Sequence, residues 1–239
     1  MNVIYDKLKS ALRAESEKNS LLNESVRISC KALTAKQAIG TPRHDDYPII
    51  KGKEVMVEAD FRGSKGQAFS DSFEQITYCL NDLLSIDLNA NARRASFIAG
   101  LNAVYRSLGL CEKTIHCRDT EPEQCADNLL KDVQMPEKIL MIGFQPRFIN
   151  VLSENRHIRV IDLDKDNIGK NVNGVIVEAE SGTDEALKWC DMVFATGSTI
   201  VNGTIARFIN QPKPAIFYGV TISAAGQILG LKTCCSHGH

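Results

Sequence analysis

The hydrophobic residues of this chain follow two different patterns, one in each half. In the second half, continuous apolar runs such as Ile139–Ile142 and Met192–Ala195 are separated by helix-length segments. Such short runs predict buried parallel strands, because helices cover both faces of a parallel sheet. In the first half, a helical stripe over Val3–Glu15 precedes two alternating stretches, Val26–Ala32 and Lys53–Phe61, which predict half-buried strands. Together the patterns predict an α/β protein whose halves are built differently.

The order of the elements predicts two domains. Strands come before helices in residues 1–110, which indicates a smaller α+β domain. Strands and helices alternate in residues 111–239, which indicates a Rossmann-like domain with a parallel-rich sheet. The connector around residues 110–136 is polar and contains proline, and we therefore expect the two domains to meet there.

Several further elements follow from local signals. A helix is expected over Asn91–Ser107, since a glycine soon follows it as a C-terminal signal. Ala35–Ile39 is the candidate hairpin partner of the first strand. Ile200–Ile209 is expected to form one helix. The sheet is expected to be complete at the end of Ala215–Gly219, which would leave residues 233–239 as a peripheral tail.

Composition excludes several classes of protein. The 239 residues include 28 basic and 29 acidic ones, for a net charge of −1, without a basic block, and this balance argues against a nucleic-acid partner. The longest apolar runs have the length of strands, which argues against a membrane partner, and the N-terminus lacks the pattern of a signal peptide. We therefore expect a cytoplasmic protein whose eight cysteines are reduced thiols rather than a disulfide framework.

The segment Arg62–Asp71 contains two glycines and two basic residues, and we expect a loop there. In one interpretation, the glycines only supply the positive φ angles of a tight connection. In the other, the backbone around Lys65, Gly66 and Gln67 contacts a ligand. The local pattern does not choose between the two.

The strand ends of the second half predict where a ligand binds. Ligands of open parallel sheets lie at the carboxyl ends of the strands, and Gly143, Asp162 and the Thr196–Thr199 turn follow three of them. Gly143 and Asp162 have the spacing of a dinucleotide-binding fold, but a single glycine where three are needed argues against NAD or FAD. Asp162 is also a suitable cap of its own turn. The Thr196–Thr199 turn favours a phosphate or carboxylate over simple capping, since a helix begins there.

Two groups of His and Cys residues are candidates for a metal site. In an extended tail, Cys235, His237 and His239 would share one face, and a thiolate with two imidazoles suits a transition metal such as zinc. The alternative is a frayed chain end without a site. The donors of residues 116–125 lack a standard zinc spacing, and we expect them to be polar residues of the cleft.

Three motifs resemble those of one known family. They are Thr114–Ala126, Gly197–Thr204 and Phe217–Thr221, and the resemblance to the "putative heavy-metal chelation" family covers roughly Ala95–His239. The segment Gly66–Asp71 looks like the family's companion N-terminal domain, which is similar to the enolase N-terminal domain. The resemblance implies a Rossmann-like domain of unknown function, with a suggested role in metal handling or corrinoid-type cofactor biosynthesis. It implies no catalytic residues.

These observations predict a protein that binds a small anionic or metal-bearing ligand in a cleft between the two domains. The alternatives are a transferase or lyase acting on a nucleotide-like or tetrapyrrole substrate, and a non-catalytic metal-delivery or assembly protein. Whether the protein is an enzyme stays open, and a homo-oligomer is compatible with all three. The expected sheet side of the cleft consists of Gly143, Asp162, Thr196, Gly197, Ser198, Thr199, Asn202, Gly219 and Thr221. The expected opposite side consists of Lys65, Gly66, Gln67, His116 and Arg118.

Overall fold

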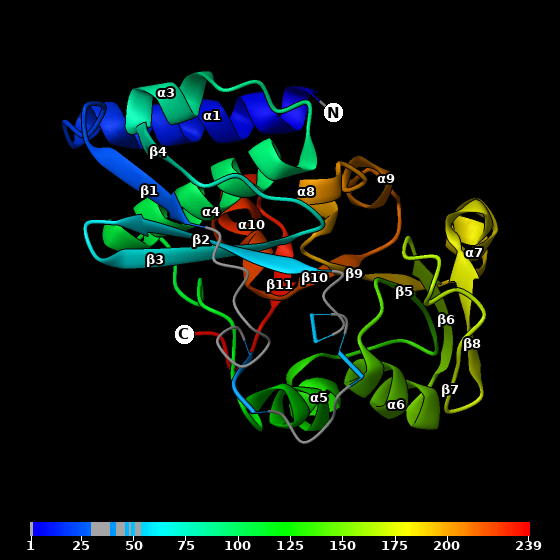
Figure 1. Ribbon diagram of the computed structural model, residues 1–239. Coiled ribbons are helices and arrows are strands. Elements are labelled where there is room, and N and C mark those ends of the chain that lie inside the picture. Colours follow the sequence, from blue (N-terminus) through cyan, green and yellow to red (C-terminus); the bar gives the residue numbers. More distant parts are fainter. Residues whose placement is uncertain (1, 30–38, 42–45, 48, 51–53) are drawn as a thin grey trace.

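The computed structural model describes residues 2–29, 39–41, 46–47, 49–50 and 54–239 (Figure 1). The elements of the first half are α1 (Asn2–Lys18), β1 (Ser25–Ser29), β2 (Val55–Phe61), β3 (Ser64–Ser70), β4 (Ile76–Cys79), α3 (Leu80–Ser85) and α4 (Asn91–Ser107). Its strands form a four-stranded antiparallel sheet in the order β3-β2-β1-β4. The expected helix at Asn91–Ser107 is confirmed, whereas residues 35–38 of the expected hairpin partner lie outside the described residues.

The second half alternates strands and helices. Its elements are α5 (Glu121–Asp132), β5 (Lys138–Ile142), α6 (Pro146–Asn155), β6 (His157–Asp162), β7 (Asn171–Val172), β8 (Val175–Ala179), the 3₁₀ turn η1 (Glu180–Gly182), α7 (Thr183–Trp189), β9 (Met192–Thr196), α8 (Thr199–Asn202), α9 (Ala206–Ile209), β10 (Ala215–Tyr218), the 3₁₀ turn η2 (Val220–Ile222), α10 (Ser223–Leu229) and β11 (Lys232–Cys234). The seven strands form a sheet in the order β11-β10-β9-β5-β6-β8-β7, and all neighbours are parallel except β7 and β8.

The strand order identifies the topology. With the parallel strands numbered along the chain from β5 to β11, the sheet reads 3-2-1-4-5-6, which is the strand order of dinucleotide-binding folds. The order reverses between β5 and β9. The prediction of an α/β protein, with a small sheet before a parallel-rich Rossmann-like one, is therefore confirmed.

Helix α4 connects the two sheets through its packing. It lies against β2 and β3 of the first sheet and against α8 and α10 of the second half. One hydrophobic cluster accordingly contains side chains of both halves, such as Phe97 of α4 and Phe217 of β10, and a second cluster lies under α5 and α6 on the other face of the large sheet (Figure 1). The two sheets are separate, but their cores are continuous through α4, and the domain boundary at residue 110 stays a prediction.

The segment expected to be a loop at Arg62–Asp71 is a strand. Only Arg62 and Gly63 form the turn, with φ angles of 54° and 82°, and Ser64 already pairs with Phe61. Two left-handed residues are the geometry that joins antiparallel strands most tightly. The loop prediction was wrong because the two glycines have different structural roles. Gly63 makes the turn, whereas Gly66 lets β3 approach α4, since a Cβ there would lie 2.4 Å from the carbonyl oxygen of Ala99.

Two predictions for the end of the chain are also corrected. The helix expected over Ile200–Ile209 is divided into α8 and α9, because Gly203 adopts a left-handed φ of 84° and ends α8. The sheet is not complete at Gly219, since β11 adds a further parallel strand beside β10. The last residue is held as well, because the backbones of Ile115 and His239 exchange two hydrogen bonds of 2.8 and 2.9 Å.

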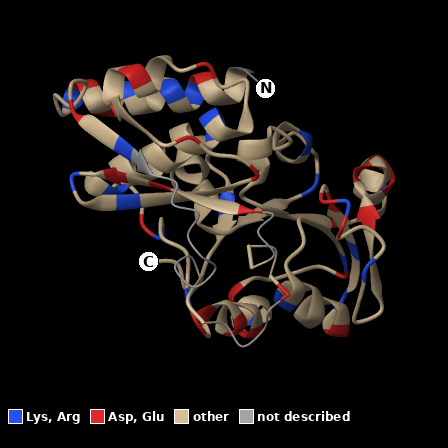
Figure 2. Cartoon of the chain, in the orientation of Figure 1, with Lys and Arg blue, Asp and Glu red and all other residues tan. Residues whose placement is uncertain are grey.

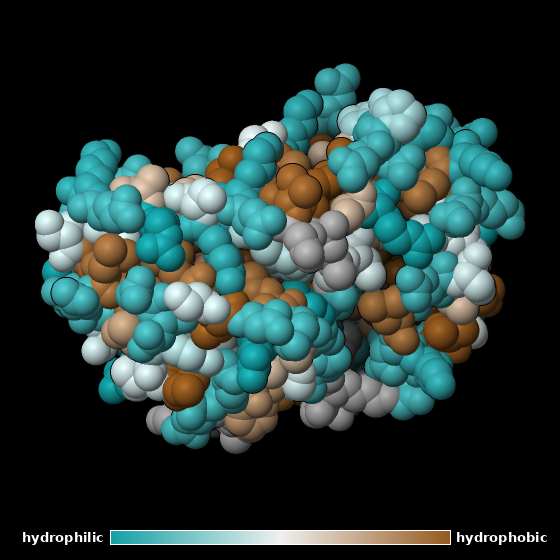
Figure 3. Space-filling model, turned by 90° about the horizontal axis from the view of Figure 1, so that it is seen from above, coloured by the Kyte–Doolittle hydropathy of each residue, from teal (hydrophilic) through white to brown (hydrophobic). Residues whose placement is uncertain are grey.

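Charged residues of both signs occur over both halves (Figure 2). On the face seen in Figure 3, hydrophobic residues form separate patches among hydrophilic ones. Among the described residues, no helix combines the length and the apolar composition that a membrane crossing requires.

Because β11 covers the edge of β10, removal of residues 233–239 should destabilise the fold rather than leave it intact. We expect the free energy of unfolding to fall by about 3 kcal/mol, from several lost backbone hydrogen bonds and the loss of the buried Cys234 side chain. Urea unfolding measures this. The variant Ser236→Ala, which removes only an exposed hydrogen bond to Asp132, serves as control and should change stability by less than about 0.5 kcal/mol. Equal stability of the truncated and full-length proteins would contradict the structural role of β11.

Candidate functional site

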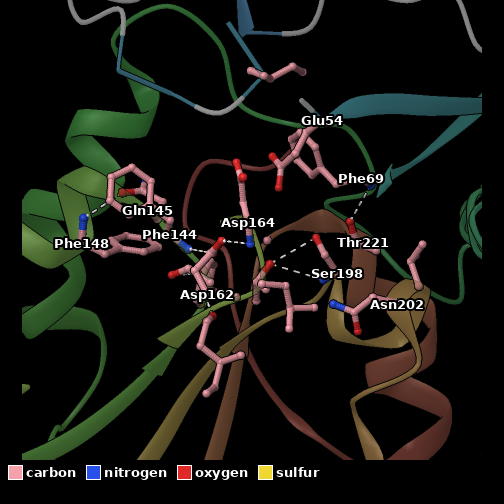
Figure 4. A pocket seen from close by; sticks show the side chains of 18 of the residues that line it. Glu54, Phe69, Phe144, Gln145, Phe148, Asp162, Asp164, Ser198, Asn202 and Thr221 are labelled. Carbon is pink, nitrogen blue, oxygen red and sulfur yellow. Dashed lines mark hydrogen bonds between the residues drawn. The ribbon is translucent and has the colours of Figure 1, made fainter. Parts of the chain in front are cut away.

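A cavity of about 550 Å³ lies at the carboxyl ends of β5, β6, β9 and β10. Its other wall comes from the first half, at the end of β3, and from the connector before α5. The cavity therefore lies at the point where the strand order of the large sheet reverses, and between the two sheets (Figure 4). Of the sequence-predicted residues, those that line it are Gly143, Asp162, Thr196, Ser198, Asn202, Gly219, Thr221 and His116, together with Cys235 from the tail. Gly197, Thr199, Lys65, Gly66, Gln67, Arg118, His237 and His239 do not line it.

The turn after β5 is closely packed around Gly143. This glycine has a φ of 98°, and a Cβ on it would lie 2.8 Å from Cγ2 of Thr196 and 3.0 Å from the hydroxyl of Tyr218. The Tyr218 hydroxyl donates a hydrogen bond of 3.1 Å to the carbonyl oxygen of Ile142. The Gln145 side chain then caps α6 by accepting from Phe148 N at 2.8 Å. The single glycine thus serves close packing between neighbouring strand ends.

Asp162 organises the loop after β6. Its carboxylate accepts hydrogen bonds from the backbone amides of Phe144 and Asp164, each at 2.7 Å, and one of 3.3 Å from the side chain of Asn167. Burial raises the pKa of Asp162, although these hydrogen bonds act in the opposite direction. The residue lines the cavity, as the sequence predicted, and it also caps its own turn, which was the alternative interpretation.

The turn after β9 presents hydroxyl and amide groups to the cavity. Thr196 and Ser198 are joined by a hydrogen bond of 3.2 Å between their hydroxyls, and Asn202 lies one helical turn further on (Figure 4). Thr199 is turned inward, where its hydroxyl donates to the carbonyl oxygen of Thr196 at 2.8 Å. Gly197 packs against Ile222, whose backbone nitrogen would lie 2.9 Å from a Cβ. Since α8 has only four residues, its dipole adds little for an anion, and the side chains are the binding groups of this turn.

The first half contributes a wall different from the predicted one. Gln67 is buried and holds the connector, since its side chain accepts from His116 N at 2.7 Å and donates to Glu58 at 2.8 Å. Lys65 is paired with Glu58 at 2.7 Å on the surface. The cavity is lined instead by the end of β3, where the backbone amide of Phe69 donates to the hydroxyl of Thr221 at 3.1 Å (Figure 4).

His116 lies at the wall of the cavity. Its Nδ1 lies 2.7 Å from the carbonyl oxygen of Cys117, which can only accept, so Nδ1 carries the proton and Nε2 keeps a lone pair. Burial lowers the pKa of His116, which favours the neutral form. The ring also makes an edge contact with Phe69, with centroids 5.1 Å apart.

Four cysteines from two distant segments line the same cavity: Cys117, Cys125, Cys234 and Cys235. Burial raises the pKa of Cys234 to about 12 and that of Cys235 to about 11, so both thiols are protonated at neutral pH. The tail histidines lie elsewhere, with Nε2 of His239 2.9 Å from Glu121. In the described part of the chain, no group of three or more His, Cys, Asp or Glu side chains is arranged to hold a metal ion, so Cys235, His237 and His239 do not converge on one.

Sequence analysis missed Glu54, which precedes β2 and lines the cavity. Burial, and to a smaller extent the nearby carboxylates of Asp162 and Asp164, raise the pKa of Glu54 to about 7. The local sequence shows only an alternating strand. Its proximity to the loop after β6 arises from the packing of the two halves, so no local signal indicates it.

Comparisons with known proteins bear on this fold. Residues 128–229 match the model of the DUF364 family, described as "putative heavy-metal chelation". No curated protein matches the chain. A crystal structure of a DUF364 protein of unknown function from Pyrococcus horikoshii is similar, with a TM-score of 0.56, 14% identity, and coverage of 94% of this chain and 80% of the other. A second, from Desulfitobacterium hafniense DCB-2, has a TM-score of 0.50, 14% identity, and coverage of 73% and 72%. At this identity the likeness shows the fold.

The variant Gly143→Ala tests the close packing at the turn after β5. Because it combines a left-handed φ with a contact of 2.8 Å to Thr196, we expect it to lower the free energy of unfolding by about 2–4 kcal/mol. Gly169→Ala is the matched control, since its φ is 83° and nothing lies within 4 Å of its Cβ position. It should cost about 1 kcal/mol. Urea unfolding compares the two, and equal losses would show that the strand ends have room for a side chain.

The raised pKa of Glu54 predicts a pH-dependent stability. The unfolded chain ionises Glu54 near 4.5, whereas the folded protein does so near 7, so wild-type stability falls between these values and stays lower above them. Relative to Glu54→Gln, we expect the wild type to lose about 2 kcal/mol between pH 5 and pH 8. The exposed substitution Glu154→Gln is the control. Urea unfolding at pH 5 and pH 8 measures the stability of wild type and both variants. The prediction is contradicted if the change in stability between the two pH values differs from that of wild type by the same amount in Glu54→Gln and Glu154→Gln.

Proposed function

We propose that this protein, which residues 128–229 make a member of the DUF364 family, described as "putative heavy-metal chelation", binds a small organic ligand. The proposed site is the cavity at the carboxyl edge of its parallel sheet. The position of the cavity is the observation that carries the proposal. It lies where the strand order reverses between β5 and β9, and folds of this topology bind their ligands at that point. A volume of about 550 Å³ is typical of small-molecule sites.

The lining supports an organic ligand with both apolar and polar parts. Aromatic rings of Phe144 and Phe148 line one side of the cavity, and the hydroxyls of Ser198 and Thr221 lie on the other side, next to Phe69, as hydrogen-bonding groups (Figure 4). A few polar groups on a mainly apolar wall are the usual means by which a site fixes the orientation of a ligand.

The charges of the wall give little support to the simple anion expected from sequence. The carboxyl groups among the described lining residues belong to Glu54, Asp71, Asp162, Asp164 and Glu180. Arg207 is the one lysine or arginine among them, and its guanidinium is paired with Glu180 and Asp184, each at 2.9 Å. Burial lowers the pKa of His116, which disfavours its cationic form. A free phosphate or carboxylate would therefore meet like charges.

A metal-bearing ligand is the second candidate, and His116 is the observation that favours it. Metal-ligating histidines usually donate their other ring nitrogen to a carbonyl or carboxylate, as Nδ1 of His116 does to Cys117. Since the described residues offer no group of three donors, the metal would have to arrive with most of its own ligands. This candidate keeps the connection to the metal-related description of the family.

Native mass spectrometry of freshly purified protein tests the proposal. We expect wild type to retain an organic mass, and Ser198→Trp to lose it, because the indole would fill the space beside the turn after β9. The control is Ser10→Trp, the same exchange at an exposed position on α1, which should retain the ligand. A retained metal without organic mass would favour a delivery role. Equal retention by both tryptophan variants, or no retained mass in wild type, would contradict the proposal.

A further inference from the structure

We propose that the cavity selects an organic cation, a ligand with a protonated amine on an apolar body, and that Glu54 is the residue that pairs with the amine. This inference rests on the proposed function and specifies the class of ligand. It follows from three features of the described residues: the sign of the charges on the wall, the position of Glu54, and the aromatic rings around it.

Among the carboxyl groups of the described lining residues, that of Glu54 has no partner among the described residues. Asp162 accepts from the backbone amides of Phe144 and Asp164. Asp71 accepts from Asn91 at 2.8 Å, and Glu180 is paired with Arg207. No hydrogen bond or ion pair joins Glu54 to another described residue, although burial raises its pKa and the carboxylates of Asp162 and Asp164 lie near it. A buried charge without a partner is costly, so a cationic ligand would supply the interaction that is missing.

The carboxyl group of Glu54 points into the cavity. Figure 4 shows it directed toward the carboxylate of Asp164, across the gap between the two halves. Asp162 and Asp164 are the charged groups that face it from the loop after β6, and both disfavour its ionisation. A cation placed between the two sides of this gap would be attracted by all three groups, whereas an anion would be repelled by them.

Aromatic rings make the site suitable for the apolar body of such a ligand. Phe69, Phe144 and Tyr218 line the cavity, and the faces of such rings attract cations as well as apolar groups. Phe144 already accepts a contact of this kind, since Nζ of Lys170 lies 5.1 Å from its ring centroid. A bare metal ion is the less suitable cation, because the described residues provide no group of three donors for it.

Binding of an amine should be linked to protons. The amine pairs with the ionised form of Glu54, and the pKa of Glu54 is raised to about 7. Below this value the carboxyl must lose its proton before it can pair, so the affinity for an amine should rise by about 10-fold between pH 6 and pH 8. A neutral ligand of the same shape should show no such dependence.

Three probes with one apolar body and different charge provide the test: 4-phenylbutylamine, 4-phenylbutan-1-ol and 4-phenylbutyrate. Calorimetric titration of the full-length protein at pH 8 should give an affinity for the amine that is about 10-fold or more above that for the alcohol. The affinity for the carboxylate should be lower than that for the alcohol. Glu54→Gln should remove the preference for the amine and leave the affinity for the alcohol unchanged. Glu154→Gln, an exposed exchange of the same type, should behave as wild type.

The outcomes separate this inference from the proposed function. If the alcohol binds wild type as tightly as the amine, or if Glu54→Gln keeps the preference for the amine, the selection of a cation by Glu54 is overturned, while ligand binding in the cavity stands. If none of the three probes binds at millimolar concentration, and native mass spectrometry finds no retained mass, both ideas are overturned. If Ser198→Trp binds the amine as wild type does, the amine binds outside the cavity and the inference fails.

Discussion

The side-chain amide of Asn102 joins the two halves of this protein at a fully buried point. Its Nδ2 donates to the carbonyl oxygens of Gln67 in β3 and Val220 in η2, at 3.0 and 3.2 Å, and its Oδ1 accepts from Ala224 N at 2.9 Å. The residue is fully buried, so each backbone group that lost it would be left without a partner, at about 1–3 kcal/mol. The amide thereby fixes how β3 approaches the segment after β10, and the end of β3 and that segment both line the cavity.

The same dependence holds for the turn after β9. A short helix leaves its last carbonyl groups without intrahelical partners, and in α8 those of Ile200 and Val201 accept from the hydroxyl of Tyr5 and from Nε of Arg94. Both donors belong to the first half of the chain. The hydroxyl and amide groups that the second half presents to the cavity are therefore held in place from α1 and α4. The site is a product of the interface between the two halves, and neither half contains it alone.

The electrostatic character of the cavity follows from this arrangement. Closing the two halves brings Glu54 next to the loop that Asp162 and Asp164 occupy, and burial raises the pKa of Glu54 and of Asp162. The fold tolerates the carboxyl groups because Asp162 is held by backbone amides and the raised pKa of Glu54 reduces its ionisation near neutral pH. Burial likewise keeps the thiols of Cys234 and Cys235 protonated. A wall of this kind suits a cationic organic ligand better than the anion that the sequence suggested.

The sequence by itself determined the elements that depend on local patterns. Apolar runs identify β5 and β9, and the carboxyl edge that carries Gly143, Asp162 and Ser198 follows from the strand direction, because parallel strands end at one edge of a sheet. Only the tertiary structure decided which residues face this edge. Gly66 has the same local signature whether it contacts a ligand or α4, and Glu54 acquires its environment from residues more than a hundred positions away. Burial and charge at the cavity depend on residues of both halves, whereas a local sequence pattern contains residues of only one half.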